Sequence, residues 1–195
     1  MFDDIFEFEK NLSQFTGAPY VVATDCCTHA IELCFIYKQY ANVSFTPFTY
    51  LSIPMLMHKL KINYTYLNEE SQEWIGEYNF KNTNIWDSAR RLERYMYRAG
   101  QFQCLSFGHN KPLEIGRGGA ILLDNKYAYK ILKEMSYDGR DLTISPWEKQ
   151  ETFRVGYHYR PTIEEAIVGS EMLETVEEQK QFVKYPDLRN VNIIK

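Results

Sequence analysis

Cysteine is scarce in this sequence, and its spacing argues against two common roles. Four cysteines occur in 195 residues, and no two of them form a CxxC pair. Two of them, Cys26 and Cys27, are adjacent, which is a poor arrangement for a zinc site or a disulfide framework, so we expect reduced thiols in a cytosolic compartment. The four histidines also lack metal-binding spacing such as HExxH, and we therefore assign no metal.

Long apolar runs and basic blocks are missing as well. No hydrophobic stretch approaches the roughly 18 residues of a membrane span, and the N-terminal MFDDIFEFEK is acidic where a secretory signal needs a basic flank. The 22 Lys and Arg residues against 26 Asp and Glu give a net charge of -4, with no cluster long enough to follow a phosphate backbone. We therefore expect a soluble, cytoplasmic protein that binds neither membranes nor nucleic acid.

Strand and helix patterns alternate along the chain, without a repeat or a flexible linker, and a hydrophobic content of 45% is enough for one substantial core. Strands are predicted at 20–24, 43–45, 62–67, 84–86, 103–107 and 120–123. Helices are predicted at 6–15, 28–40, 50–61, 126–136 and about 162–182. This alternation indicates an α/β fold with three layers, α/β/α, around a mostly parallel central sheet.

Several polar residues directly follow predicted strands, where ligands bind in such sheets. Thr28 opens a helix whose N-terminus favours phosphate, and Ser106 offers a second hydroxyl. Tyr50 offers a flat face for an aromatic ring, Asp87 can hold a ring nitrogen protonated, and Lys111 supplies an amine. A phosphate site, a stacking face, a carboxylate and a lysine are together what pyridoxal 5'-phosphate (PLP) requires.

Each of these residues alone has an ordinary structural explanation. Thr28 could be a plain helix cap, Tyr50 a core residue, Asp87 the cap of a following helix, and Lys111 a solvated loop residue. Their order and spacing along the chain favour the cofactor site.

The segments that carry these residues resemble the DegT/DnrJ/StrS family of PLP-dependent sugar aminotransferases, which have the aspartate aminotransferase type of fold. The most specific segment is SFGHNKPLEIGRGGAILLD, with a lysine five residues after the serine and a Gly-x-Gly-Gly turn into a strand. Three further segments support the resemblance and occur in the same order as in the family, namely DCCTHAIEL, FTPFTYLS and IWDSARRL. It covers almost the whole chain.

Carried onto this sequence, the resemblance implies a role for each residue of the site. Lys111 would form a Schiff base with PLP and then move a proton, and Asp87 would pair with the pyridine nitrogen. Tyr50 would stack on the ring. The phosphate would be held by Thr28, Ser106 and the backbone at Cys27.

Some positions depart from the family's pattern. Cys27 replaces the glycine of Ser-Gly-Thr, which implies weaker phosphate binding. Arg90 stands where a histidine or glutamine faces the phenolic oxygen of the cofactor, and we assign it as a cofactor contact because a cation favours the phenolate. His158 replaces an asparagine that reaches the phosphate of the neighbouring subunit. Arg117, in the glycine turn, is either functional or solvated, and His109 either touches the cofactor or lies on a surface loop.

The resemblance also implies how the chain is organised and what it does. Residues 1–160 would form the PLP-binding large domain, and residues 161–195 a C-terminal helix and tail that stop before the family's small domain. The active sites would lie at the interface of a homodimer. The implied activity is transfer of an amino group from an amino acid, typically glutamate, to a nucleotide-linked keto sugar for polysaccharide biosynthesis. The alternative is a PLP-binding remnant that is not catalytic or needs a partner.

Overall fold

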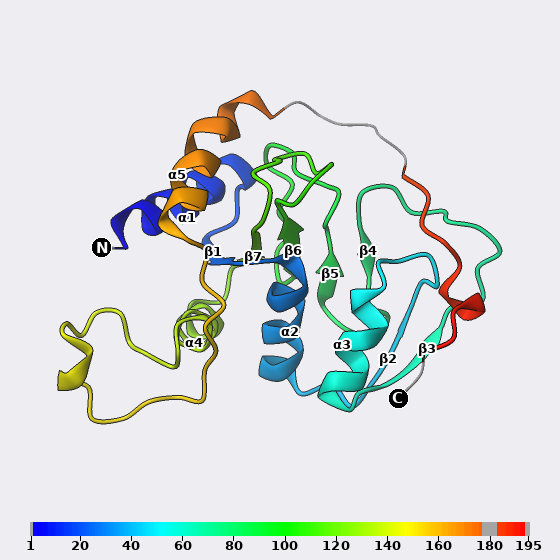
Figure 1. Ribbon diagram of the computed structural model, residues 1–195, viewed down its shortest axis with the longest axis horizontal. Helices are drawn as coiled ribbons and strands as arrows, with labels where there is room; N and C mark the ends of the chain where they lie inside the picture. Colours follow the sequence, from blue (N-terminus) through cyan, green and yellow to red (C-terminus); the bar gives the residue numbers. More distant parts are fainter. Residues whose placement is uncertain (1, 177–182, 194–195) are drawn as a thin grey trace.

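A mixed five-stranded sheet forms the centre of the protein, as seen in a computed structural model that describes residues 2–176 and 183–193 (Figure 1). Its strand order is β1-β7-β6-β5-β4. In this order the strands are Tyr20–Thr24, Gly119–Leu123, Phe102–Ser106, Ile85–Asp87 and Tyr78–Asn79. Within this sheet, as far as the structure describes the chain, only β5 and β6 pair in parallel, whereas the other three pairs are antiparallel.

The prediction of a mostly parallel sheet is therefore wrong. The strands β6 and β7 are joined by the glycine-containing turn that carries Lys111, with no helix between them. A strand that returns through a turn runs antiparallel to its neighbour, whereas a parallel pair needs a longer crossover. β7 thus runs back between β6 and β1, and it is antiparallel to both.

Two predicted strands form a separate small sheet. β2 (Asn42–Phe45) and β3 (Asn63–Tyr66) pair in parallel, and α3 (Ser52–Leu60) makes the crossover between them. The two-residue strand β4 was not predicted from the sequence. A single bridge between Ser44 and Lys81 connects the small sheet to the segment that follows β4.

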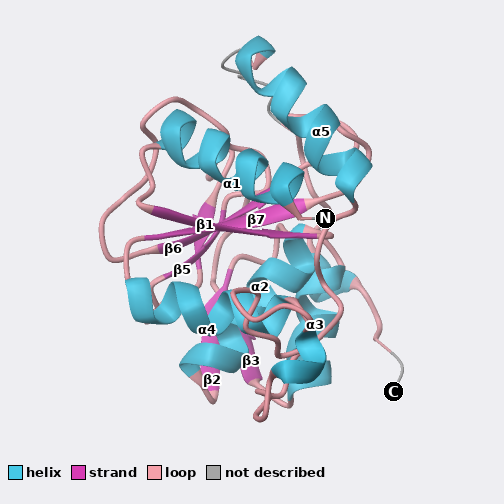
Figure 2. Ribbon diagram, turned by 90° about the vertical axis from the view of Figure 1, so that its left-hand side faces the viewer, coloured by secondary structure: helices cyan, strands magenta, loops and turns pink. Residues whose placement is uncertain are grey.

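Helices cover both faces of the central sheet (Figure 2). On one face lie α1 (Asp3–Thr16) and α5 (Ile163–Met172), which pack against each other. On the other lie α2 (Cys27–Lys38) and α4 (Lys126–Ser136), together with α3. The layered α/β/α arrangement agrees with the prediction.

The central strands contribute to a hydrophobic cluster on each face of the sheet. In β7, Ile121 and Leu123 belong to the cluster under α2 and α4, whereas Ala120 and Leu122 belong to the cluster under α1. Successive side chains of a strand point to opposite faces, so a strand that is buried on both faces has a continuous apolar sequence. This explains the run GAILL in the sequence.

Helix ends follow the sequence signals in most places. As predicted, α1 ends at Gly17, which adopts a left-handed conformation and donates its N–H to the carbonyl of Ser13. The predicted helix at 162–182 is shorter, because its α-helical part ends at Met172 and a 3-10 turn, Leu173–Thr175, follows. The hydroxyl of Thr175 bonds to the carbonyl of Met172 and satisfies a group that a longer helix would pair. Residues 177–182 of that prediction lie outside the described residues.

Among the described residues, no helix has both the length and the apolar character needed to cross a membrane.

Candidate functional site

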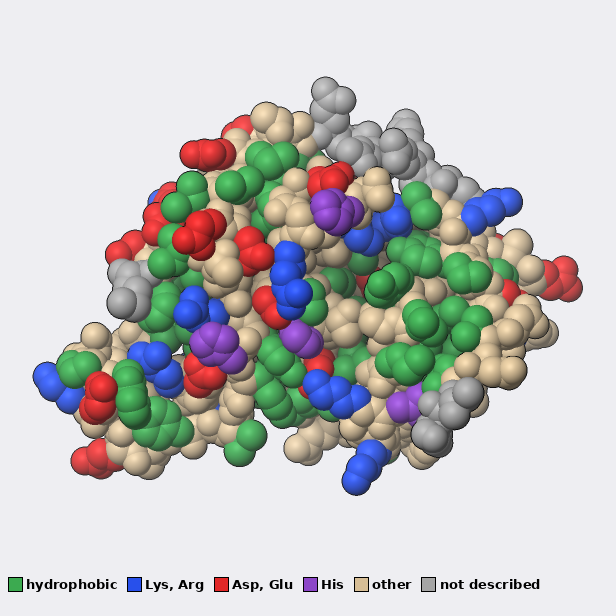
Figure 3. Space-filling view, in the orientation of Figure 1, with side chains coloured by type: hydrophobic (Ala, Val, Ile, Leu, Met, Phe, Trp, Pro, Cys, Tyr) green, Lys and Arg blue, Asp and Glu red, His purple; other side chains and the backbone are tan. Residues whose placement is uncertain are grey.

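A cavity of about 410 Å³ lies beside the ends of β1, β5 and β6. It is lined by all but one of the residues predicted to form the site, namely Cys27, Thr28, Tyr50, Asp87, Arg90, Ser106 and Lys111. Its other lining residues include Trp74, Tyr78, His109 and Tyr185. Figure 3 shows one face of the molecule, on which Lys, Arg and His side chains lie beside a group of hydrophobic ones.

Asp87 is the buried carboxylate of the cavity. It is the last residue of β5 and is 6% exposed. Its Oδ1 accepts the N–H of Ala89 at 3.0 Å, and its Oδ2 accepts the hydroxyl of Tyr78 at 3.0 Å. Burial raises the pKa of the Asp87 carboxyl, although the Ala89 N–H, the charge of Lys111 and the Tyr78 hydroxyl act in the opposite direction. A positively charged ligand atom beside Asp87 would therefore be favoured.

Tyr78 is a residue of the site that the sequence reasoning missed. Its hydroxyl lies 2.6 Å from Oγ1 of Thr49 and donates to Asp87, so it fixes the orientation of the carboxylate. Tyr78 and Phe80 are both buried and are separated by one residue, Asn79. That alternation is typical of one face of a strand and could have indicated β4.

Cys27 contributes its side chain to the cavity, whereas the sequence analysis predicted a role only for its backbone. Its Sγ lies 4.0 Å from Oδ1 of Asp87 and 3.5 Å from the carbonyl oxygen of Cys104. Burial raises the pKa of the Cys27 thiol well above its usual value, and the charge of Asp87 adds to the effect. The thiol is therefore a neutral neighbour of the carboxylate.

Lys111 lies on the loop between β6 and β7 and is partly exposed to the cavity. Within residues 2–176 and 183–193, no hydrogen bond or ion pair involves its Nζ. The preceding residue, Asn110, adopts a left-handed conformation with φ of 58°, which asparagine tolerates better than most side chains. Arg90 Nη1 donates to the carbonyl of Asn110 at 3.2 Å and holds this loop. The amine of Lys111 is thus placed in the cavity without a partner among the described residues.

The N-terminus of α2 and nearby hydroxyls form the polar end of the cavity. The helix begins at Cys27, one residue before the predicted start, and Cys26 caps it by accepting the N–H of His29. Thr28 Oγ1 lies 2.8 Å from the hydroxyl of Ser52, and Ser106 lines the same cavity. Unpaired N–H groups and the helix dipole favour an anion at such a position.

The glycines of the turn before β7 have two roles. They let the chain reverse its direction, and they let its backbone approach the backbone at the start of α2. Gly118 has φ of 129°, which a residue with a side chain rarely adopts. At Gly119, a Cβ atom would lie only 2.5 Å from backbone atoms of Cys26 and Cys27. The absence of a side chain lets β7 pack directly against the start of α2.

Tyr50 and His158 differ in their relation to the cavity. Tyr50 lies at its edge and is 63% exposed, so its ring is accessible for stacking. His158 lies outside the cavity, where its Nδ1 is 3.0 Å from a carboxylate oxygen of Asp138. The role predicted for His158 concerns a neighbouring subunit and stays a prediction.

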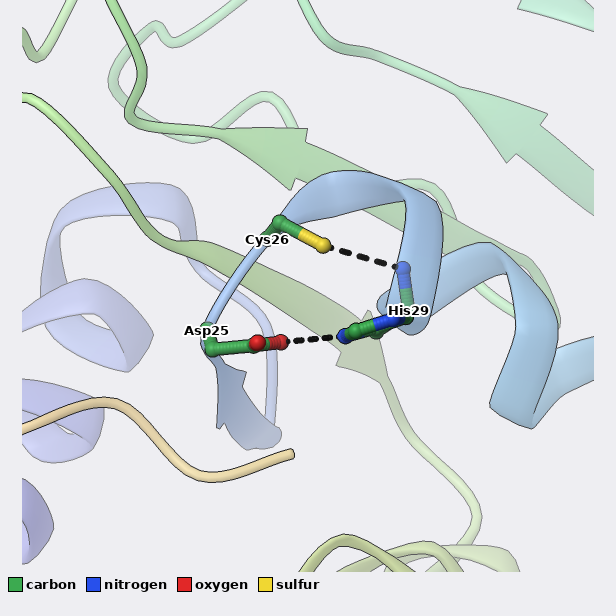
Figure 4. A group of neighbouring side chains, drawn as sticks. All are labelled: Asp25, Cys26 and His29. Atoms are coloured by element: carbon green, nitrogen blue, oxygen red, sulfur yellow. Dashed lines mark hydrogen bonds and ion pairs between the residues drawn. The ribbon is translucent and has the colours of Figure 1, made fainter. Parts of the chain in front are cut away.

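Arg117 and three other polar residues form a cluster next to the start of α2. The side-chain ligand atoms of Asp25, Cys26 and His29 lie within 4.8 Å of one another, a grouping that their sequence spacing did not indicate (Figure 4). His29 Nδ1 is 2.6 Å from Oδ1 of Asp25, and Arg117 donates to Oδ2 at 2.7 Å. Because two cationic side chains already engage both oxygens of Asp25, we assign no metal to this cluster.

The His29–Asp25 pair makes stability depend on pH. Burial disfavours the charged imidazole, but the hydrogen bonds to Asp25 and Cys26 outweigh burial and raise the pKa of His29 from 6.5 to about 9. The folded protein therefore retains a proton that the unfolded chain loses above about pH 6.5. This contribution to stability is complete below that pH and is lost as the pH rises through about 9.

Replacing His29 with glutamine is expected to flatten the fall in stability between about pH 6.5 and 9. Urea unfolding of the two proteins at several pH values measures the slope. The matched control is His109→Gln, because the imidazole of His109 is 80% exposed. Equal slopes for the wild type and His29→Gln would contradict the assignment of the proton to His29.

The geometry can be compared with known proteins. A putative PLP-dependent aminotransferase from Bacillus cereus ATCC 10987 matches with a TM-score of 0.71 and 16% identity, over 88% of this chain and 58% of that one. The sugar aminotransferase CalS13 from Micromonospora echinospora matches with a TM-score of 0.69 and 16% identity, over 89% and 60%. The PLP-form of the putative sugar aminotransferase Spr1654 from Streptococcus pneumoniae matches with a TM-score of 0.69 and 15% identity, over 89% and 59%.

These matches define the fold as that of the large domain of PLP-dependent aminotransferases. Residues 89–182 match the sequence profile of the DegT/DnrJ/EryC1/StrS aminotransferase family. This match agrees with the family resemblance found in the sequence and confirms it over residues 89–182. It spans about 58% of the length of the first solved structures that it matches. No curated protein matches the sequence significantly.

Proposed function

We propose that this chain binds PLP in the cavity and carries out the amino-transfer chemistry of its family. One observation carries the proposal: Lys111, whose amine has no partner among the residues that the structure describes, and the buried carboxylate of Asp87 line the same cavity. The cavity volume of about 410 Å³ lies within the range of small-molecule sites, about 300–1,000 Å³. The polar end of the cavity, with Thr28 and Ser106, suits a phosphate group.

The residues of the cavity fit the chemical groups of PLP. When bound, PLP supplies an electron sink that stabilises negative charge on the substrate carbon. Asp87, with its orientation fixed by Tyr78, would hold a proton on the ring nitrogen. Burial favours such pairing, because a buried carboxylate lacks the solvation that stabilises its charge in water.

Lys111 is the residue we assign to bond formation and proton transfer. Its Nζ would attach the cofactor covalently, and after displacement by the amino donor it would take a proton from the substrate carbon and deliver it to the cofactor carbon. Its lack of a salt-bridge partner among the described residues supports this role, because an amine held in an ion pair would have to be released first.

The names of the structural relatives, rather than the cavity, support the proposed substrate class. CalS13 and Spr1654 are described as sugar aminotransferases or putative ones. We propose an amino acid such as glutamate as donor and a nucleotide-linked keto sugar as acceptor. The alternative of a PLP-binding protein without amino transfer is an outcome of the experiment below.

We also propose that the protein acts in the cytoplasm as a homodimer with its active sites at the interface. A loop between α4 and α5 extends away from the sheet (Figure 1). It exposes the large apolar side chains of Trp147, Phe153 and Val155, of which Val155 is 80% exposed. Exposed apolar groups that lie close together are typical of an interaction surface.

The proposed function is tested by a half-reaction. PLP-loaded protein is mixed with L-glutamate, and the release of 2-oxoglutarate is measured for the wild type, for Lys111→Ala and for Lys126→Ala as a control outside the cavity. We expect Lys111→Ala to react about 10²–10⁴-fold more slowly, as for loss of a general acid–base group, and Lys126→Ala to match the wild type. PLP binding without any 2-oxoglutarate would favour the alternative, and equal rates in all three proteins would contradict the proposal.

A further inference from the structure

The C-terminal segment 183–193 packs beside the cavity. The side chain of Gln72 holds its start, donating to the carbonyl of Val183 at 3.0 Å and accepting the N–H of Tyr185 at 2.8 Å. Further along, the N–H of Leu188 bonds to the carbonyl of Pro47 at 3.0 Å, and the Leu188 side chain is buried. In Figure 1 this segment, coloured red, lies on the same side of the view as β3 and β4. Contacts at two points thus fix its position.

Tyr185 forms part of the cavity wall. Its ring stacks on Trp74 with the ring centroids 5.7 Å apart and an angle of 26° between the planes. Trp74 is itself fixed, because its indole N–H bonds to the carbonyl of Phe48 at 3.1 Å. Both aromatic side chains line the cavity, so the C-terminal segment contributes a rigid surface to it.

Tyr185 also holds Arg90. Arg90 Nε donates to the hydroxyl of Tyr185 at 3.1 Å, and the guanidinium lies 5.5 Å from the centre of the Tyr185 ring. Through Nη1, the same guanidinium donates to the carbonyl of Asn110, the residue before Lys111. Contacts therefore run from the C-terminal segment through Arg90 to the loop that carries the lysine.

The charge of Arg90 remains available to a ligand. Among the residues that the structure describes, no carboxylate lies within ion-pair distance of this guanidinium, whereas Arg91 and Arg98 in the same region both pair with Glu77. An arginine that lines a cavity and is not neutralised by an acidic neighbour favours an anionic ligand.

We infer that Tyr185 is a positioning residue of the cavity, which holds Arg90 toward an anionic ligand and steadies the loop of Lys111. The identity of that ligand as PLP rests on the proposed function. Tyr185 acts through Arg90, so the inference requires the hydroxyl as well as the ring of Tyr185.

The inference predicts how PLP affinity responds to substitutions at this position. Tyr185→Phe keeps the ring and removes the hydroxyl, and it is expected to weaken PLP binding about 10-fold, as for loss of a hydrogen bond to a charged group. Tyr185→Leu also removes the stacking and is expected to weaken binding further. Absorbance titration with PLP measures each affinity, and a thermal melt verifies that each variant is folded. The control is Tyr127→Phe, at an exposed tyrosine outside this cavity.

A second measurement separates this inference from the proposed function. In the protein without cofactor, the Nε–H of Arg90 is expected to exchange slowly with solvent in the wild type and at least about 10-fold faster in Tyr185→Phe, as measured by NMR. If the wild type fails to bind PLP, the proposed function fails and this exchange rate alone decides the inference. Unchanged exchange, or PLP affinity unchanged in Tyr185→Phe when the wild type binds, would overturn it.

Discussion

Replacing Asp87 with asparagine is expected to slow the half-reaction with glutamate by about 10²–10³-fold, the effect of removing one preorganised electrostatic group from an active site. The amide has the same shape and can keep the contacts with Tyr78 and the N–H of Ala89. It carries no charge, so it cannot hold a proton on the ring nitrogen of PLP. The measurement is the initial rate of 2-oxoglutarate release from PLP-loaded protein.

The control for this prediction is Asp4→Asn, at an exposed aspartate in the first turn of α1 that does not line the cavity. It is expected to react at the wild-type rate. A thermal melt of each variant separates a loss of chemistry from a loss of fold. A folded Asp87→Asn protein that reacts as fast as the wild type would show that the carboxylate has no role in the reaction.

Replacing Glu9 with alanine is expected to lower the free energy of unfolding by about 3–5 kcal/mol, because it leaves a buried charge without its partner. Glu9 of α1 pairs with Lys133 of α4, and both side chains are almost fully buried. A carboxylate oxygen of Glu9 also accepts the N–H of Ala23 in β1 at 2.7 Å. The substitution thus removes contacts from two neighbouring elements at once, and urea unfolding measures the effect.

The same helix provides a matched control in Glu7→Ala. Glu7 pairs with Lys10 on the surface, where both side chains are more than half exposed, and such pairs contribute at most about 1 kcal/mol. The double variant Glu9→Leu/Lys133→Met replaces the buried pair with apolar groups and is expected to recover most of the lost stability. Equal losses for Glu9→Ala and Glu7→Ala would contradict the account of the buried pair.

The sequence predicts most elements of this fold because their signals are local. The strand at 20–24 and the helix at 126–136 have the predicted bounds, and Gly17 ends α1 as expected. The direction of the strands cannot be predicted from such local signals. The position of β7 between β1 and β6 depends on contacts between residues that are far apart in the sequence. The glycine turn before β7 is a local sign that the chain reverses direction there. The prediction of a mostly parallel sheet rests instead on the alternation of strands and helices elsewhere in the chain.

The same distinction applies to the cavity. Thr28, Asp87 and Lys111 could be predicted because each follows a strand and lies in a recognisable motif. Tyr78 and Tyr185 could not, because their importance depends on the atoms that their hydroxyls contact. Tyr185 reaches Arg90 across 95 positions of sequence, and no local pattern indicates that contact.

The central claim is that Lys111 binds PLP covalently in this cavity, and peptide mapping after reduction tests it most directly. Purified protein is incubated with PLP, treated with borohydride and digested, and the phosphopyridoxyl label is located by mass spectrometry, with Lys111→Ala as the control. The account predicts label on the peptide that contains Lys111, and loss of that label without a compensating gain elsewhere in Lys111→Ala. Label spread over surface lysines, with no excess at Lys111, would contradict the account.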